Sequence, residues 1–202
     1  MFLPILGASA SSHNQKTSSV PILVLGDSLS AAFGIEKSQG WVNLLNQKLI
    51  EQHYPYTVIN ASISGETSQG GVQRLPQLLK KYHPKIVILE LGANDGLRGL
   101  NLTMLQRNLQ MMISGCQREK AQVLLIGMRL PPNYGPQYTQ QFHQIYIDLA
   151  KSNRLALVPF LLDGVATRTE LMQTDGLHPV AEAQPTLLNT VWDKLSALLK
   201  KN

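Results

Sequence analysis

The chain alternates between short apolar runs and longer stretches in which apolar residues recur every three or four positions. Short runs bounded by Gly or Pro predict buried strands, and the longer spacing predicts amphipathic helices. We therefore predict five strands, at residues 21–26, 57–60, 85–91, 122–128 and 155–158. We predict helices at residues 41–53, around 75–82, and at 103–117, 138–153 and 181–200. Pro185 is expected to interrupt the first turn of the last helix.

Strands that alternate with helices predict a three-layer α/β/α fold around a flavodoxin-like five-stranded parallel sheet. Each crossover between parallel strands is right-handed and packs a helix on one face of the sheet. In the first helix, Val42, Leu45, Leu49 and Ile50 are expected to face inward. A chain of 202 residues fits a single domain. We assign residues 20–202 to this domain and residues 1–19 to an N-terminal tail.

The N-terminal tail has the pattern of a shortened signal peptide. Phe2–Gly7 is apolar, and Ala8-Ser9-Ala10 resembles a signal-peptidase site, although no Lys or Arg precedes the apolar run. A frayed tail is the alternative interpretation. The signal-peptide interpretation predicts a periplasmic or secreted protein. No apolar run reaches 18 residues, so we predict no permanent membrane crossing.

Net charge and the single cysteine exclude some classes of function. The formal charge is +5, but the basic residues form small clusters such as Lys80-Lys81 and Lys200-Lys201, without interleaved aromatic residues or a nucleic-acid motif. We therefore predict no nucleic-acid partner, and at most transient contact with an anionic membrane surface. Cys116 is the only cysteine and shares a helix face with Leu105 and Leu109. This placement predicts a core residue rather than a catalytic thiol.

Four polar segments follow the predicted strands, and they carry the candidate chemistry. They are Gly26–Leu29, Ser64–Thr67, Gly92–Asp95 and Asp175–Pro179. In an open parallel sheet, ligands bind outside the carboxyl ends of the strands. Loops that are far apart in sequence are therefore expected to meet at this one edge.

The residue types in these loops suit acyl transfer. A serine hydroxyl becomes a nucleophile when a base takes its proton, and histidine is the usual base near neutral pH. We predict Ser28 as the nucleophile and His178 as its base, with Asp175 fixing the tautomer of the histidine. The backbone N–H groups of Ser28 and Gly65 and the side-chain amide of Asn94 are the predicted oxyanion donors.

The sequence blocks resemble those of the SGNH (GDSL) hydrolases, in the same order. GDSLSAAFG, NASISGETSQGG, LGANDGLRG, RLPPNYG and DGLHP carry the resemblance, which extends from about residue 21 to residue 194. It implies that Ser28, Gly65, Asn94 and His178 are the four name-giving residues and that Asp175 completes a catalytic triad. It also implies a serine hydrolase that cleaves fatty acyl esters and thioesters through an acyl-enzyme, with no cofactor.

The loop after Asn94 suggests medium or long acyl chains as substrates. Gly96 and Gly99 flank Leu97 and Arg98, and Leu100 follows directly. We therefore interpret residues 96–101 as a mobile apolar gate. The expected apolar wall comprises Leu29, Leu97, Leu100, Tyr134 and Leu177. The alternative is that these leucines only pack the loop onto the domain.

Other functions remain open at this point. A carbohydrate O-deacetylase would use the same triad, and the same fold also hosts non-catalytic flavodoxin-like binding modules. The residues after the first strand, however, are not the Ser/Thr-rich cradle that a flavin phosphate needs. The histidines other than His178 are scattered, so we predict no metal site. We expect a monomer that acts on small-molecule substrates.

Overall fold

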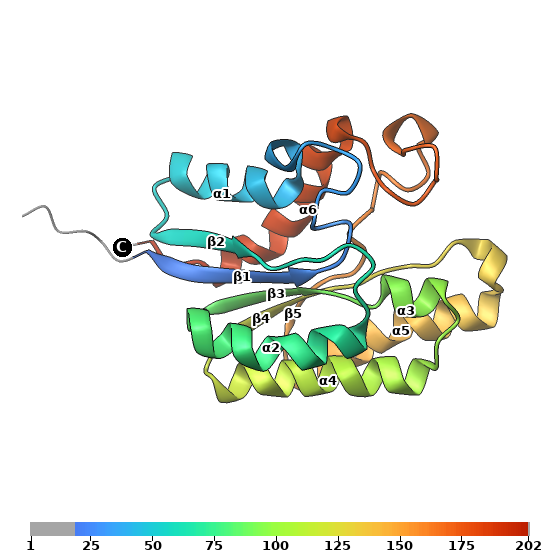
Figure 1. Ribbon diagram of the computed structural model, residues 1–202, viewed down its shortest axis with the longest axis horizontal. Helices are drawn as coiled ribbons and strands as arrows, with labels where there is room; N and C mark the ends of the chain where they lie inside the picture. Colours follow the sequence, from blue (N-terminus) through green and yellow to red (C-terminus); the bar gives the residue numbers. More distant parts are fainter. Residues whose placement is uncertain (1–18, 202) are drawn as a thin grey trace, which may run out of the picture.

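The computed structural model describes residues 19–201 and contains one parallel sheet of five strands (Figure 1). The strands lie in the order β2-β1-β3-β4-β5. Their bounds are β1 Val20–Gly26, β2 Tyr56–Asn60, β3 Ile86–Glu90, β4 Gln122–Ile126 and β5 Ala156–Val158. The predicted signal peptide lies outside the described residues. No helix within these residues is long and apolar enough to cross a membrane.

Helices cover both faces of the sheet, which confirms the predicted three-layer α/β/α architecture (Figure 1). α1 and α6 lie on one face, and α2, α4 and α5 lie on the other. The α-helices are α1 Trp41–Glu51, α2 Ser68–Tyr82, α3 Ala93–Leu97, α4 Leu102–Arg118, α5 Pro136–Asn153 and α6 Gln184–Leu195. Short 3-10 turns are η1 Lys37–Gln39, η2 Pro132–Tyr134, η3 Thr169–Leu171, η4 Ala181–Ala183 and η5 Ser196–Leu198.

The core consists of the central strands and the helix faces that pack on them. β1, β3 and β4 are almost wholly buried, because strands covered on both faces need apolar side chains on both sides. Cys116 is fully buried on α4, as predicted, and burial raises the pKa of its thiol to about 12. A thiol in this state is neutral near pH 7 and therefore unsuited to nucleophilic catalysis.

Several helix boundaries differ from the predictions. α1 ends at Glu51, and Ile50 is 63% exposed, so its predicted inward orientation is wrong; Trp41 is buried at the start of this helix instead. α2 begins at Ser68, earlier than expected, because Thr67 caps it by accepting a hydrogen bond from the N–H of Gly70. The closing helix is divided among η4, α6 and η5. Pro185 lies in the first turn of α6, where a missing N–H costs little.

The order of the strands places a crevice between β1 and β3. From β1 the chain passes to β2 on one side and then returns to β3 on the other. At such a reversal the connections diverge to opposite faces and leave room for a ligand at the carboxyl ends. Ser28 follows β1 and Asn94 follows β3, so both lie at this crevice.

Candidate active site

Ser28, His178 and Asp175 form a chain of hydrogen bonds at the carboxyl edge of the sheet. Oγ of Ser28 lies 2.8 Å from Nε2 of His178, and Nδ1 of His178 lies 2.6 Å from Oδ2 of Asp175. A proton on Nδ1 donated to the carboxylate leaves Nε2 free to accept the serine proton. Residues that lie 150 positions apart in sequence therefore meet in the geometry that acyl transfer requires.

The loop at residues 175–179 holds the histidine by its own hydrogen bonds. Oδ1 of Asp175 accepts from the backbone N–H groups of Leu177 and His178. Partial burial raises the pKa of Asp175, but these N–H groups and the imidazole outweigh burial and lower the pKa to about 2. On its other side, the imidazole packs against the ring of Phe33, with 4.5 Å between centroids. Asp175 is therefore ionised near neutral pH and fixes the orientation of His178.

Two of the three predicted oxyanion donors are free. Neither the N–H of Ser28 nor that of Gly65 donates a hydrogen bond within residues 19–201. Gly65 lines the cavity next to Ser28 and has φ of +79°, a conformation that residues with a Cβ rarely adopt. The third donor, Nδ2 of Asn94, lies 3.2 Å from Oδ2 of Asp27 and 3.0 Å from the carbonyl oxygen of Glu66. An oxyanion would share this amide with those two acceptors.

Asn94 is anchored through α3, a short helix that was not predicted from the sequence. Its neighbour Asp95 is buried and accepts hydrogen bonds from the backbone N–H and the hydroxyl of Ser68, at 2.8 and 2.5 Å. Asn108 on α4 donates to the same hydroxyl. These bonds join the starts of α2 and α3 and thereby fix the position of Asn94 relative to Gly65.

The carboxyl groups of Asp27 and Glu90 are buried next to the turn that carries Ser28. Oε2 of Glu90 accepts from the hydroxyl of Ser30 at 2.7 Å and from the N–H of Asp27 at 3.2 Å. Burial, and then the neighbouring Asp27, raise the pKa of Glu90 well above its usual range. Burial also raises the pKa of Asp27 to about 6, against the N–H of Leu29, the charge of His178 and the amide of Asn94. Neither Asp27 nor Glu90 was among the site residues predicted from the sequence.

We expect Asp27→Asn to change stability in a pH-dependent way. The native pKa of about 6 exceeds the ordinary 3.8, so the contribution of Asp27 to stability is greatest below pH 4 and falls as the pH rises through 6. Asparagine does not titrate in this range. The difference in Tm, variant minus wild type, should therefore increase by several degrees from pH 4 to pH 8. Thermal unfolding across this range measures the difference.

The same variant should also lose activity. The single acceptor of an asparagine cannot serve both the N–H of Leu29 and the amide of Asn94, so the Asn94 side chain should turn and kcat should fall. Asp163→Asn, at an exposed position outside the site, is the matched control. A Tm difference that stays constant from pH 4 to pH 8 would contradict the argument.

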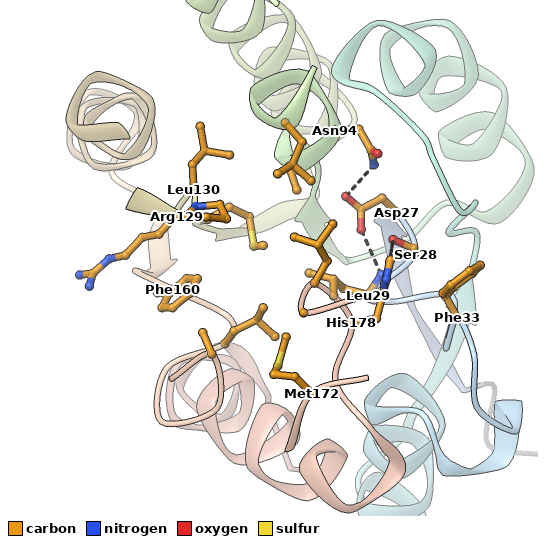
Figure 2. A pocket seen from close by; sticks show the side chains of 18 of the residues that line it. Asp27, Ser28, Leu29, Phe33, Asn94, Arg129, Leu130, Phe160, Met172 and His178 are labelled. Carbon is orange, nitrogen blue, oxygen red and sulfur yellow. Dashed lines mark hydrogen bonds between the residues drawn. The ribbon is translucent and has the colours of Figure 1, made fainter. Parts of the chain in front are cut away.

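An apolar cavity of about 540 Å³ extends from the hydrogen-bonded chain toward β4 and β5. Figure 2 shows Asp27, Ser28, Asn94 and His178 on one side of it, with Arg129, Leu130 and Phe160 on the other. Leu29, Leu97 and Leu177 line the cavity, as predicted. Leu100 and Tyr134 do not: Leu100 is exposed, and the hydroxyl of Tyr134 turns to the carbonyl of Leu97, to which it donates at 3.0 Å.

The predicted gate at residues 96–101 is in part a fixed structure. Gly96 is buried within α3, where an added Cβ would lie 2.7 Å from atoms of Leu130 and Phe142, so it serves close packing rather than mobility. The hydroxyl of Tyr138 donates to the carbonyl of Leu100 at 3.1 Å and ties down the far end. Only Gly99, with φ of +64° and open space around it, has the glycine character that the gate hypothesis assumed.

The sequence analysis missed most of the wall opposite the nucleophile. This wall comes from the loops after β4 and β5 and from the start of the loop that leads to His178, and it includes Met128, Leu130, Pro131, Phe160, Leu162 and Met172. The block RLPPNYG was part of the resemblance, and its first residues, Arg129 to Pro132, all line the cavity. That block was the signal that could have located the wall.

The parallel α/β sheet and the Ser–His–Asp chain at its carboxyl edge are features of serine ester hydrolases. The chain belongs to the GDSL-like lipase/acylhydrolase family, whose profile matches residues 24–184. It is an ester hydrolase of this family.

Particular relatives agree with this assignment. Esterase TesA of Pseudomonas aeruginosa is 50% identical over 185 residues, which cover 92% of this chain and 92% of the relative. Thioesterase 1/protease 1/lysophospholipase L1 of Escherichia coli is 42% identical and covers 88% of this chain and 84% of its own. The crystal structure of psychrotrophic esterase EstA from Pseudoalteromonas sp. superposes with a TM-score of 0.84, at 40% identity, and covers 88% of this chain and 97% of its own.

Proposed function

We propose that this hydrolase cleaves carboxylic esters and thioesters of fatty acids through an acyl-enzyme on Ser28. The observation that carries the proposal is the 2.8 Å contact between Ser28 and His178 at the mouth of an apolar cavity. The names of the relatives, an esterase and a thioesterase/lysophospholipase, support both kinds of bond as substrates. The structure of EstA is of a form inhibited by monoethylphosphonate.

The geometry supports a two-step reaction. Oγ of Ser28 bonds to the carbonyl carbon while its proton passes to Nε2 of His178, and the carbonyl oxygen becomes an oxyanion near the N–H groups of Ser28 and Gly65. The intermediate collapses, and the leaving oxygen or sulfur takes the proton from Nε2 as its bond to carbon breaks. In the second step, water attacks the carbonyl carbon of the acyl-enzyme while His178 takes a proton from the water. The bond between Oγ and the acyl carbon then breaks, His178 returns the proton to Ser28, and the fatty acid leaves.

We propose that the apolar cavity holds the acyl chain. Its lining is mostly apolar and includes Leu29, Leu97, Leu162 and Phe160. Each buried methylene contributes about 0.8 kcal/mol, or roughly a fourfold gain in binding. We therefore expect kcat/KM to rise by roughly this factor per carbon from acetyl to medium-chain p-nitrophenyl esters, and then to level off where the cavity ends.

Substitution of a wall residue tests the location of the chain. Phe160→Ala should weaken the preference for longer chains while leaving acetyl ester hydrolysis within a few-fold of wild type. Met111→Ala, an exposed residue on α4 outside this cavity, is the control. A clear preference for acetyl esters in the wild type would instead indicate the O-deacetylase, which would use the same triad.

The proposal also covers the localisation and the oligomeric state of the protein. We propose a periplasmic or secreted enzyme, on the basis of the signal-peptide pattern in residues 1–10, which lies outside the described residues. We propose that it acts as a monomer on small-molecule substrates, because all the groups used in the reaction come from one chain.

A further inference from the structure

A second cavity, of about 490 Å³, adjoins the apolar one and has a different chemistry. It lies beside β2 and the start of α1, on the side of the nucleophile turn that faces away from β4 and β5. Polar residues dominate its wall: Lys37, Asn43, Asn46, Asn60, Ser62 and Ser64 all take part. No Asp or Glu of the described chain lines it.

The two cavities meet at the site of the reaction. Ser64, the residue before the predicted oxyanion donor Gly65, lines both of them. Ser28 lines the apolar cavity, whereas Ser30 and Ala31 in the same turn line the polar one. The nucleophile turn therefore separates an apolar compartment from a polar compartment.

Two donors in the polar cavity have no partner within the described residues. Asn46 accepts from the N–H of Val58 through Oδ1, while its Nδ2 makes no hydrogen bond within residues 19–201. Lys37 is exposed and forms no ion pair with any of these residues. An unused amide N–H donor beside a lysine, with no acid in the wall, favours an anion rich in oxygen acceptors.

We infer that the polar cavity binds a phosphate group carried by the leaving group of the substrate. The inference rests on the proposed function, because it takes Ser28 as the nucleophile and the apolar cavity as the acyl site. In the tetrahedral intermediate the acyl chain and the leaving group point in different directions from the same carbon. With the acyl chain among the apolar residues, the leaving group is directed past Ser64 toward Lys37. Phosphate occurs in such leaving groups in lysophospholipids and in coenzyme A thioesters.

The test compares three substrates that share an octanoyl chain: an octanoyl lysophosphatidylglycerol, octanoyl-CoA and p-nitrophenyl octanoate, which has no phosphate. Lys37→Ala should raise KM for a phosphorylated substrate about tenfold, the loss expected for one charge-assisted hydrogen bond at a partly exposed site. It should leave p-nitrophenyl octanoate within twofold. Lys37→Arg should restore binding, and Lys48→Ala, on α1 with its ammonium group over the ring of Trp192 and outside this cavity, is the control.

The possible results distinguish the two sources of phosphate, and they test the inference separately from the proposed function. A loss confined to the lysophospholipid identifies a glycerophosphate headgroup, and a loss confined to octanoyl-CoA identifies the coenzyme. An equal loss on all three substrates would show that Lys37 supports the fold, and no loss on any would show that the cavity binds no phosphate; both results overturn the inference. A wild type that hydrolyses none of the three would instead refute the proposed function.

Discussion

Replacing Ser28 with alanine is expected to lower kcat by about 10⁶-fold, the effect of removing the nucleophile from a triad in which the members act as a unit. Within the described chain, the Ser28 hydroxyl is the hydrogen-bond partner of Nε2 of His178, so it is the group from which this base can take a proton. Single-turnover kinetics with p-nitrophenyl octanoate measure the loss. Binding of the ester should change little, because the cavity wall remains intact.

Covalent labelling gives an independent readout of the same prediction. A fluorophosphonate probe should label the wild type and should fail to label Ser28→Ala. Ser152→Ala, at an exposed position on α5, is the matched control and should label like the wild type. Labelling that persists in Ser28→Ala would place the nucleophile at another residue and would refute the proposed mechanism.

The fold could be predicted from the sequence because its central strands have an unambiguous pattern. The run at residues 86–90 is wholly apolar except for Glu90, and a short run of this kind between a proline and a glycine suits only a strand covered on both faces. The start of α2 was harder to predict. Its first turns contain Ser68, Gly70 and Gly71, which have low helix propensity, and the helix forms there because Thr67 caps it and Asp95 binds Ser68.

The reacting residues were predictable for a different reason. Ser28 and Asn94 directly follow β1 and β3, and the topology of a parallel sheet brings such positions together without any knowledge of side-chain contacts. His178 lies in the long irregular segment beyond β5, and the DGLHP block is what identified it. The cavity wall lacks this regularity. Phe160 and Leu162 lie in an irregular loop, where neither helical nor strand periodicity indicates which side chain turns inward. Tyr134 is likewise held by a contact that no periodicity indicates, the hydrogen bond from its hydroxyl to the carbonyl of Leu97.

Buried polar groups were the least predictable part. Glu90 lies at the end of the apolar strand β3, and its carboxyl group is accommodated because Gly26 leaves space there: an added Cβ would lie 2.5 Å from Oε2. This pairing depends on the register of β1 against β3, in which Gly26 lies opposite Glu90. Register is a property of two strands together, so no local pattern in either strand reveals it.

Asp175→Asn is expected to lower kcat by about 10⁴-fold with little change in KM, because an asparagine leaves the geometry intact but reverses the tautomer of the base. The aspartate accepts the Nδ1 proton of His178 at 2.6 Å, which leaves Nε2 free to accept from Ser28. An amide nitrogen in place of Oδ2 would donate to Nδ1, so the imidazole proton would move to Nε2 and point at the serine hydroxyl. Nε2 would then already carry a proton and could not accept the proton of the Ser28 hydroxyl.

Stability should distinguish this effect from misfolding. The pKa of Asp175 is lowered to about 2, so its contribution to stability is present above pH 4 and is lost as the pH falls through 2. The side chain is 38% exposed, which screens the interaction, and we expect the Tm of Asp175→Asn at pH 7 to lie within a few degrees of wild type. Asp193→Asn, on α6 away from the site, is the control for loss of one surface charge. A kcat within tenfold of wild type would show that His178 keeps its tautomer without Asp175, and the aspartate would then serve only to order the loop at residues 175–179.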